Sequence, residues 1–242
     1  MQVETFIQAR IGSTRLPGKV LKPVLGKPLL YYLLERVSSS SQSNAYRVLT
    51  STNPEDDAIA DFCNKNGVSV FRGPEENVLE RYYLAAQKFK PDAIVRITGD
   101  CPLIDPRVID EVIETYRKTY PQFDYVSNTL TRTYPRGMDV EIFSVDALKK
   151  AHTHASVEER EHVTLHIYRH PETFHLKNIE CRQNLSMHRW TVDTAEDFQL
   201  IQLILENLYL HHPQFSLKDI LELLKRHPHW SEINAHVQQK SV

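Results

Sequence analysis

The sequence predicts an α/β fold in which helices flank a mostly parallel, twisted sheet. Over the first 120 residues, short apolar segments alternate with segments of helical periodicity, which is the pattern of parallel strands joined by crossover helices. The chain has 242 residues, of which 41% are hydrophobic, so it can bury a substantial core. After residue 120 the alternation breaks down, which predicts an inserted β-containing arm over residues 120–185.

The elements of the first half are placed by apolar runs and by residues that typically start helices. Pro28 is expected as the first residue of a helix, Asn53 as an N-cap before Pro54, and Asp105 as an N-cap before a further proline. Strands are expected over residues 3–8, 46–51, 68–71 and 93–98, and helices over residues 28–37, 54–66, 78–89 and 107–120.

The second half of the chain is less regular. Short strands are expected around a turn at residues 135–137, and one or two more over residues 173–191. Ser144 and Ser156 are expected to cap helices, and Ser156 with Glu159 fits a capping box. Leucines recur at helical spacing near the end of the chain, so two helices are expected over residues 195–208 and 217–226.

Composition argues against several classes of protein. The 29 Lys and Arg residues against 31 Asp and Glu residues give a net charge of −2, which is not typical of a nucleic-acid binder. No apolar run approaches the roughly 18 residues of a transmembrane helix, and no secretory signal is apparent. The three cysteines (Cys63, Cys101 and Cys181) are far apart, which suits a reducing compartment. We therefore expect a cytoplasmic protein that binds neither nucleic acid nor membranes.

A basic loop follows the first strand and is the most informative segment. Residues 5–34 carry five cations and no Asp or Glu: Arg10, Arg15, Lys19, Lys22 and Lys27. In parallel sheets, ligands bind outside the carboxyl ends of the strands. Gly12 and Ser13 can offer N–H groups and a hydroxyl to phosphate oxygens, while the cations supply charge-assisted bonds. The loop matches neither the P-loop nor the Rossmann glycine pattern, and a solvated basic loop is the alternative.

Two aspartates are candidate metal ligands. Asp100 ends an apolar strand at the same edge of the sheet as the basic loop, where a carboxylate could hold Mg²⁺ against phosphates. Asp193 follows another strand-like segment. The alternative for Asp100 is a turn residue before Pro102, and for Asp193 it is a helix N-cap.

Three histidines recur every four residues. His162, His166 and His170 are expected to share one face of a helix. HxxxH spacing can bind zinc, but no HExxH motif or cysteine cluster completes such a site. A polar helix face is therefore the preferred interpretation.

The segment QARIGSTRLPGK, residues 8–19, resembles the first motif of the cytidylyltransferase family, which activates sugar acids as CMP derivatives. The resemblance is nearest to the branch of spore-coat polysaccharide biosynthesis proteins F. One departure is Asn77, where that branch leads us to expect Asp. Further motifs follow in order: TS at 50–51, DD at 56–57, NVLERY at 77–82, RITGDCPL at 96–103, YPRGMDVE at 134–141, REHVT at 160–164 and RWTVD at 189–193.

The resemblance implies a nucleotide-diphospho-sugar transferase-like fold, with residues 1–242 as a single nucleotidyltransferase domain. It implies transfer of CMP from CTP to a hydroxyl of a sugar or sugar acid for cell-surface polysaccharide synthesis, with release of pyrophosphate and with Mg²⁺ as cofactor. Residues 120–185 would cover the acceptor site and pair two subunits into a homodimer. A glycosyltransferase that consumes a nucleotide sugar, or a non-catalytic nucleotide-binding subunit, remains the alternative.

The residues expected at the site fall into four groups. The catalytic residues are Lys19, Arg10 and Asp100, and the metal ligands are Asp100 and Asp193. The nucleotide-binding residues are Gln8, Ala9, Arg10, Gly12, Ser13, Arg15, Lys19, Thr50, Ser51, Arg96 and Asp100, and the acceptor-binding residues are Arg136, Asp139, Glu141, Arg160, His162 and Arg189.

Overall fold

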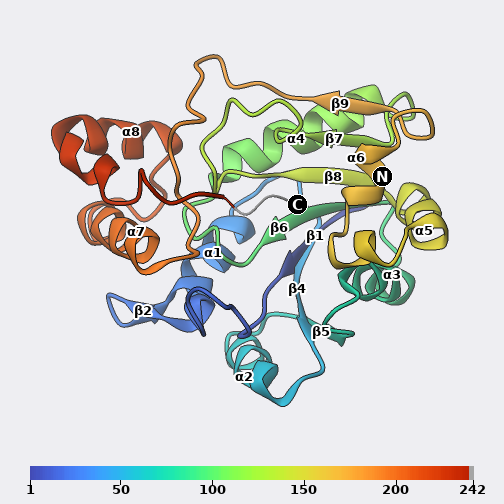
Figure 1. The fold of residues 1–242 in the computed structure, drawn as a ribbon, viewed down its shortest axis with the longest axis horizontal. Helices are drawn as coiled ribbons and strands as arrows, with labels where there is room; N and C mark the ends of the chain where they lie inside the picture. Colours follow the sequence, from blue (N-terminus) through green and yellow to red (C-terminus); the bar gives the residue numbers. More distant parts are fainter. Residues whose placement is uncertain (240–242) are drawn as a thin grey trace.

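A seven-stranded sheet forms the centre of the computed structural model, which describes residues 1–239 (Figure 1). The strand order is β5-β4-β1-β6-β8-β7-β9, and β8 is the one strand of this sheet that runs antiparallel to its neighbours. A small second sheet pairs β2 (Pro23–Val24) with β3 (Lys27–Pro28). The strands of the central sheet are β1 (Val3–Gln8), β4 (Ala45–Ser51), β5 (Val70–Gly73), β6 (Ala93–Thr98), β7 (Tyr125–Ser127), β8 (Glu141–Ser144) and β9 (Leu176–Asn178).

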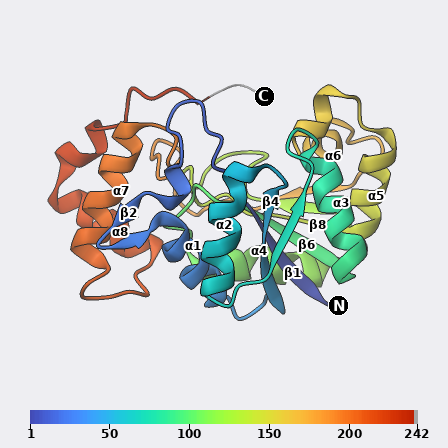
Figure 2. The same cartoon turned by 90° about the horizontal axis from the view of Figure 1, so that it is seen from below.

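Helices cover both faces of the sheet, as the alternating pattern predicts (Figure 2). One buried core joins the sheet to α1 (Leu29–Ser38), α2 (Asp57–Lys65), α4 (Pro106–Thr119), α7 (Ala195–Leu208) and α8 (Leu217–Arg226). A second core joins the opposite face to α3 (Val78–Phe89), α5 (Val145–His154) and α6 (Leu165–Arg169). Side chains alternate between the two cores along a strand: Val95 and Ile97 of β6 lie in the first, and Ile94 lies in the second.

The chain changes direction across the sheet beside β1. It runs from β1 through β4 to β5 at one edge and then returns to the other side of β1 as β6. Ligands of open α/β sheets bind at such a switch point, outside the carboxyl ends of the strands. The ends of β1 and β6 approach closely there, since a Cβ atom on Gly99 would lie 2.9 Å from the Cβ of Ala9.

Several local expectations about the helix starts are wrong. Pro28 pairs in β3 and stands before α1 as its N-cap, because α1 begins at Leu29. Asn53 does stand at the N-cap position of the 3₁₀ helix η2 (Pro54–Asp56), but its side chain donates to Glu75 and makes no capping bond. Ser156 does not cap through its hydroxyl, although its N–H donates to Glu159 Oε2 at 2.9 Å before the 3₁₀ helix η3 (Glu158–Glu161).

The region expected as an inserted arm continues the central sheet. Strand β8 pairs with β6, and β7 and β9 follow in turn toward the edge. The reason is burial: Tyr125, Val126, Ile142 and Phe143 are fully buried, and placing them in the sheet packs them beneath α4, α5 and α6. Within residues 173–191 the structure has one strand of three residues, β9.

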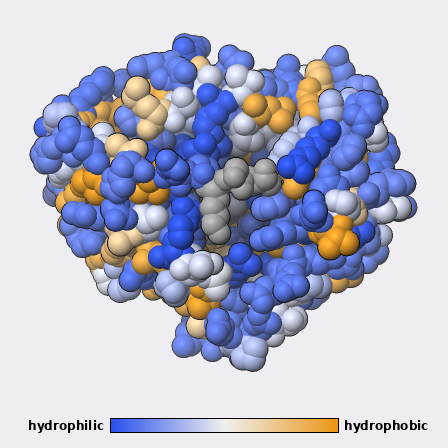
Figure 3. Space-filling view, in the orientation of Figure 1, coloured by the Kyte–Doolittle hydropathy of each residue, from blue (hydrophilic) through white to orange (hydrophobic). Residues whose placement is uncertain are grey.

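The surface shown in Figure 3 is largely hydrophilic, with apolar residues in small scattered groups. Among the described residues, no helix has the length and apolarity needed to cross a membrane.

Candidate active site

The basic loop after β1 is held in place by a buried carboxylate. Asp56 Oδ1 accepts the N–H of Ile11 at 2.7 Å, and Oδ2 accepts the N–H and the hydroxyl of Ser51 at 3.0 and 2.5 Å. Burial alone would raise the pKa of Asp56, but the hydrogen bonds from Ser51 and Ile11 outweigh it and hold the pKa below its usual value. The loop closes where Gly18, at φ +66°, donates its N–H to Ile11 O at 3.1 Å.

The loop encloses a cavity of about 250 Å³ at the carboxyl ends of β1 and β6. Thr50 and Ser51 are fully buried and lie outside its wall, so Ser51 acts on the cavity through Asp56. Arg96 is also absent from this wall. The structure brings together the remaining residues expected at the nucleotide: Gln8, Ala9, Arg10, Gly12, Ser13, Arg15, Lys19 and Asp100.

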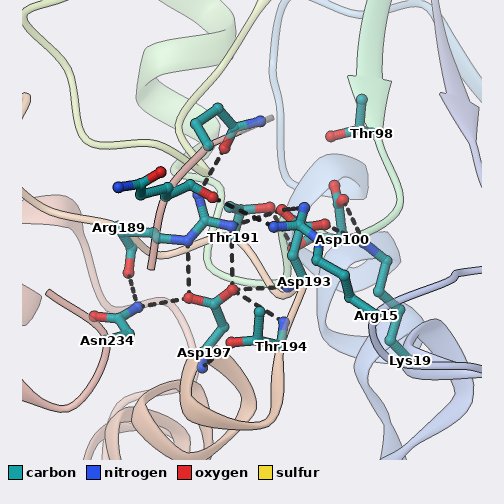
Figure 4. A network of polar contacts seen from close by, with 12 residues as sticks. Arg15, Lys19, Thr98, Asp100, Arg189, Thr191, Asp193, Thr194, Asp197 and Asn234 are labelled. Carbon is teal, nitrogen blue, oxygen red and sulfur yellow. Dashed lines mark hydrogen bonds and ion pairs between the residues drawn. The ribbon is translucent and has the colours of Figure 1, made fainter. Parts of the chain in front are cut away.

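The two candidate metal ligands converge on one ammonium group (Figure 4). Lys19 Nζ donates to Asp100 Oδ2 and to Asp193 Oδ1, both at 2.7 Å. Burial alone would lower the pKa of Lys19, but the two carboxylates outweigh it and raise the pKa above its usual value. The structure thus brings Asp100 and Asp193 together on one side chain, and their role as metal ligands stays a prediction.

Asp193 is surrounded by cations and does not cap α7. Its Oδ2 lies 2.9 Å from Arg15 Nη2 and 2.6 Å from Arg189 Nη2. The cap of α7 is Thr194, which forms a reciprocal capping box with Asp197. The alternative role of Asp193 as a helix cap is thus excluded by the structure.

A larger cavity of about 830 Å³ adjoins the first. The two cavities share four wall residues, namely Arg15, Thr98, Asp100 and Asp193. The carboxylate pair therefore stands where the two spaces meet. Of the residues expected at the acceptor, Arg136, Asp139, Glu141 and His162 line this second cavity.

Arg160 and Arg189 were also expected to bind the acceptor, and for both the structure places the side chain elsewhere. Arg160 lies in η3 and donates to the backbone oxygen of His152 at 3.2 Å, since η3 turns it toward α5. Arg189 is 7% exposed and is held by Asp197, whose Oδ1 accepts from Arg189 Nε at 2.9 Å. Arg189 thus supports Asp193 from behind and does not face the cavity.

Arg96 and Glu141 form a partly buried ion pair in the wall of the larger cavity. They are register partners on β6 and β8. Ile94 and Phe143, two residues along each strand, lie in the core that contains α3, so Arg96 and Glu141 belong to the same face. Arg96 Nε also donates to Gln8 Oε1 at 2.9 Å, and Glu141 Oε1 accepts from Tyr125 and Thr164, each at 2.6 Å. Burial would raise the pKa of Glu141, but Arg96 outweighs it and lowers the pKa.

The structure adds residues that the motifs did not mark. Arg132 donates two hydrogen bonds, of 2.6 and 2.9 Å, to the carboxylate of Asp139, and it lines the larger cavity. Asp197 is a buried support for Asp193. Asp56, which belongs to the motif at 56–57, is a buried support for the loop. No spacing in the sequence links Arg132 to Asp139, whereas the buried Asp197 could be found from its capping-box pattern with Thr194.

Asn77 and the histidines have different roles from those suggested by the sequence. Asn77 caps α3 by accepting the N–H of Glu80 at 2.9 Å, and it lines neither cavity. Asn and Asp are both good N-cap residues, so the presence of Asn in place of the expected Asp leaves the capping role unchanged.

His162 lies outside α6, so the expectation that all three histidines share one helix face is wrong. His166 and His170 lie near Glu159, with ligand atoms within 4.8 Å of one another. Both Nδ1 atoms already have hydrogen-bond partners, which are Glu159 Oε2 for His166 and the backbone oxygen of His166 for His170.

A sequence profile of the cytidylyltransferases matches residues 5–232. The chain belongs to the cytidylyltransferase family. Members of this family are enzymes that transfer a nucleotidyl group. The two alternative interpretations, a glycosyltransferase and a non-catalytic nucleotide-binding subunit, are therefore not supported.

Two relatives match nearly all of the chain. The spore coat polysaccharide biosynthesis protein SpsF of Bacillus subtilis is 35% identical over 92% of this chain and 94% of its own length. An uncharacterized protein of Methanocaldococcus jannaschii is 39% identical over 100% of this chain and 98% of its own length.

Solved cytidylyltransferase structures share this fold. One from Leptospira borgpetersenii superimposes with a TM-score of 0.91 at 34% identity and covers 100% of both chains. The CMP:2-keto-3-deoxy-manno-octonic acid synthetase, solved with CTP, gives a TM-score of 0.66 at 19% identity over 86% of this chain and 100% of its own, and this likeness concerns the fold.

The carboxylate pair suits the divalent metal expected of a cytidylyltransferase. Asp100 and Asp193 present oxygens to one point at the junction of two cavities. Mg²⁺ prefers one or two carboxylates and completes its shell with phosphate oxygens and water. The donor set therefore fits Mg²⁺, and these two residues would hold it.

Proposed function

We propose that this cytidylyltransferase transfers CMP from CTP to a hydroxyl of a sugar or sugar acid in cell-surface polysaccharide synthesis. The observation that carries the proposal is the pair of adjoining cavities that meet at Asp100 and Asp193. The named relatives support a sugar-acid acceptor: the 8-amino-3,8-dideoxy-manno-octulosonate cytidylyltransferase of Shewanella amazonensis is 33% identical over 51% of both chains.

The reaction forms one bond and breaks one. The acceptor oxygen attacks the α-phosphorus of CTP, the bond from that phosphorus to the bridging oxygen breaks, and pyrophosphate leaves while the hydroxyl proton passes to solvent. Arg10 and Lys19, together with the loop around Gly12, hold the triphosphate and offset its growing charge. A bound Mg²⁺ would supply further charge neutralisation.

The larger cavity offers a cation for an acceptor carboxylate. Arg136 lines it, and among the described residues its guanidinium has no hydrogen-bond or ion-pair partner, whereas Arg132 is bound to Asp139. Burial lowers the pKa of His162, so its ring stays neutral near neutral pH and can accept or donate a hydrogen bond. Arg136 is thus the best-placed partner for a sugar-acid carboxylate.

Pyrophosphate release with each nucleoside triphosphate, Mg²⁺ and a panel of sugars and sugar acids tests the proposal. We expect release with CTP and a sugar acid. Arg136→Met is expected to raise the acceptor KM by roughly tenfold or more while the CTP affinity stays unchanged. Arg107→Met, at an exposed arginine outside both cavities, is the matched control. Equal release with all triphosphates would contradict the cytidine assignment.

The proposal includes Mg²⁺ as cofactor, a cytoplasmic location and a homodimer. The carboxylate pair supports the metal, and the three free cysteines suit a reducing compartment. The edge strand β9 lies within residues 120–185, and edge strands can pair with a second chain, which supports this region as the subunit contact. Sedimentation would measure the assembly, and a monomer at micromolar concentration would overturn that part.

A further inference from the structure

Lys19 holds the position between the carboxylates that a bridging metal ion would need. We propose that Lys19 is the resident counter-ion of Asp100 and Asp193, so that a divalent cation binds there only together with a triphosphate that draws the ammonium away. The inference rests on the proposed function and adds an order of binding to it.

The geometry gives the ammonium two equal contacts. Lys19 Nζ lies 2.7 Å from one oxygen of each carboxylate, and the side chain of Lys19 is 12% exposed. An ion that bridged the same two oxygens would be forced against the ammonium, because Mg²⁺ binds carboxylate oxygens at about 2.0–2.1 Å. Metal and ammonium therefore compete for the pair.

The charges around the pair are already balanced. Three cations (Arg15, Lys19 and Arg189) lie among three carboxylates (Asp100, Asp193 and Asp197) in one network of ion pairs. A divalent cation that arrived alone would bring positive charge to a neutral cluster. A cation that arrives with a triphosphate brings a surplus of negative charge, and this compensates for the loss of Lys19.

Lys19 is free to leave, whereas Arg189 is not. The Lys19 side chain lines the same cavity as Arg10 and Ser13, so its flexible stem can carry the ammonium to a phosphate placed there. Arg189 is clamped between Asp193 and the fully buried Asp197. Lys19 is therefore the cation that leaves the carboxylates when a metal ion binds.

Binding of Mn²⁺ to the free protein, counted by the paramagnetic resonance of unbound Mn²⁺, tests the inference without turnover. We expect Lys19→Met to bind Mn²⁺ at least about tenfold more tightly than the wild type when no nucleotide is present. CTP is expected to tighten Mn²⁺ binding to the wild type and to do so much less in Lys19→Met. Arg15→Met is the matched control, because it removes a cation from Asp193 but leaves Lys19 between the carboxylates.

Two further variants interpret the result. Lys19→Arg keeps the charge and is expected to keep weak Mn²⁺ binding, which separates the charge from any change in folding. Adding Asp193→Asn to Lys19→Met should abolish the tighter binding, which places the ion at the pair. A folded Lys19→Met or Lys19→Gln that binds Mn²⁺ no more tightly than the wild type would overturn the inference, whereas failure of the CTP assignment alone leaves the nucleotide-free result unaffected.

Discussion

The backbone N–H of Val192 donates to the carbonyl oxygen of Asp100 at 2.9 Å. This bond ties the end of β6 to the segment before α7 and sets the neighbouring Asp193 beside Asp100. The bond from Thr191 Oγ1 to the same carbonyl, at 3.3 Å, reinforces the contact. These two hydrogen bonds to the backbone of Asp100 therefore fix the distance between the segments that carry the two carboxylates.

Removing either charge of the pair should stop the reaction while the fold persists. Asp100→Asn and Asp193→Asn keep the side-chain size and remove the group that would hold Mg²⁺. We expect each to lower kcat by orders of magnitude, with circular dichroism unchanged. Asp57→Asn, at a half-exposed residue outside both cavities, is the control. Full activity in Asp193→Asn would show that the second carboxylate has no part in transfer.

Asp56 should stabilise the loop in a pH-dependent way. Its folded pKa is lowered, so its contribution is present above the unfolded pKa of about 3.9 and is lost as pH falls through the folded value. In Asp56→Asn, an amide NH₂ group, which cannot accept a hydrogen bond, replaces one of the carboxylate oxygens that accept from Ile11 and Ser51. We expect this variant to lower the free energy of unfolding at neutral pH by about 1–3 kcal/mol. Urea unfolding at several pH values measures this, and the difference from wild type should shrink below about pH 4. A difference that grows in acid would contradict the assignment.

Substitution of Arg189 should lower both stability and activity, whereas substitution of Arg160 should leave acceptor binding nearly unchanged. Arg189→Met leaves the buried Asp197 without its cation, so the free energy of unfolding should fall by about 3–5 kcal/mol and kcat should fall with it. Arg160→Met is expected to leave the acceptor KM within about twofold, because its side chain faces His152. Thermal unfolding and steady-state kinetics on both variants check this. A large rise of acceptor KM in Arg160→Met would restore it to the acceptor site.

The cysteines should differ in reactivity toward iodoacetamide. Burial raises the pKa of Cys63 to about 12 and raises that of Cys101 well above its usual value, so both stay protonated at about pH 8. Cys181 is partly exposed. Mass spectrometry of the folded protein should find label on Cys181 and little on the other two, and unfolding in urea should expose all three. Rapid labelling of Cys101 in the folded state would contradict its burial.

The sequence predicted best where local chemistry decides the structure. The apolar run of β6 and the cap-bounded helices α3, α7 and α8 have the expected ends. The basic loop was recognisable because five cations without an acid, beside glycines and a strand end, have few structural uses.

Side-chain direction was the part that could not be read from the sequence. Arg160 and His162 belong to one short motif, yet one faces α5 and the other faces the larger cavity. The direction of each depends on how η3 packs against its neighbours. Likewise, the place of Arg189 depends on Asp197 and Asn234 lying behind it, and no local pattern in its own motif reports those partners.

The pairing of Lys19 with Asp193 joins two segments that lie 174 residues apart in the chain. A chain still emerging from the ribosome can form β1 and the basic loop early, but it has no complete carboxylate pair until the segment before α7 has been made. Incomplete chains that stop short of that segment would carry the cationic loop with half of its counter-ions. The carboxylate pair can therefore form only after synthesis has passed residue 193.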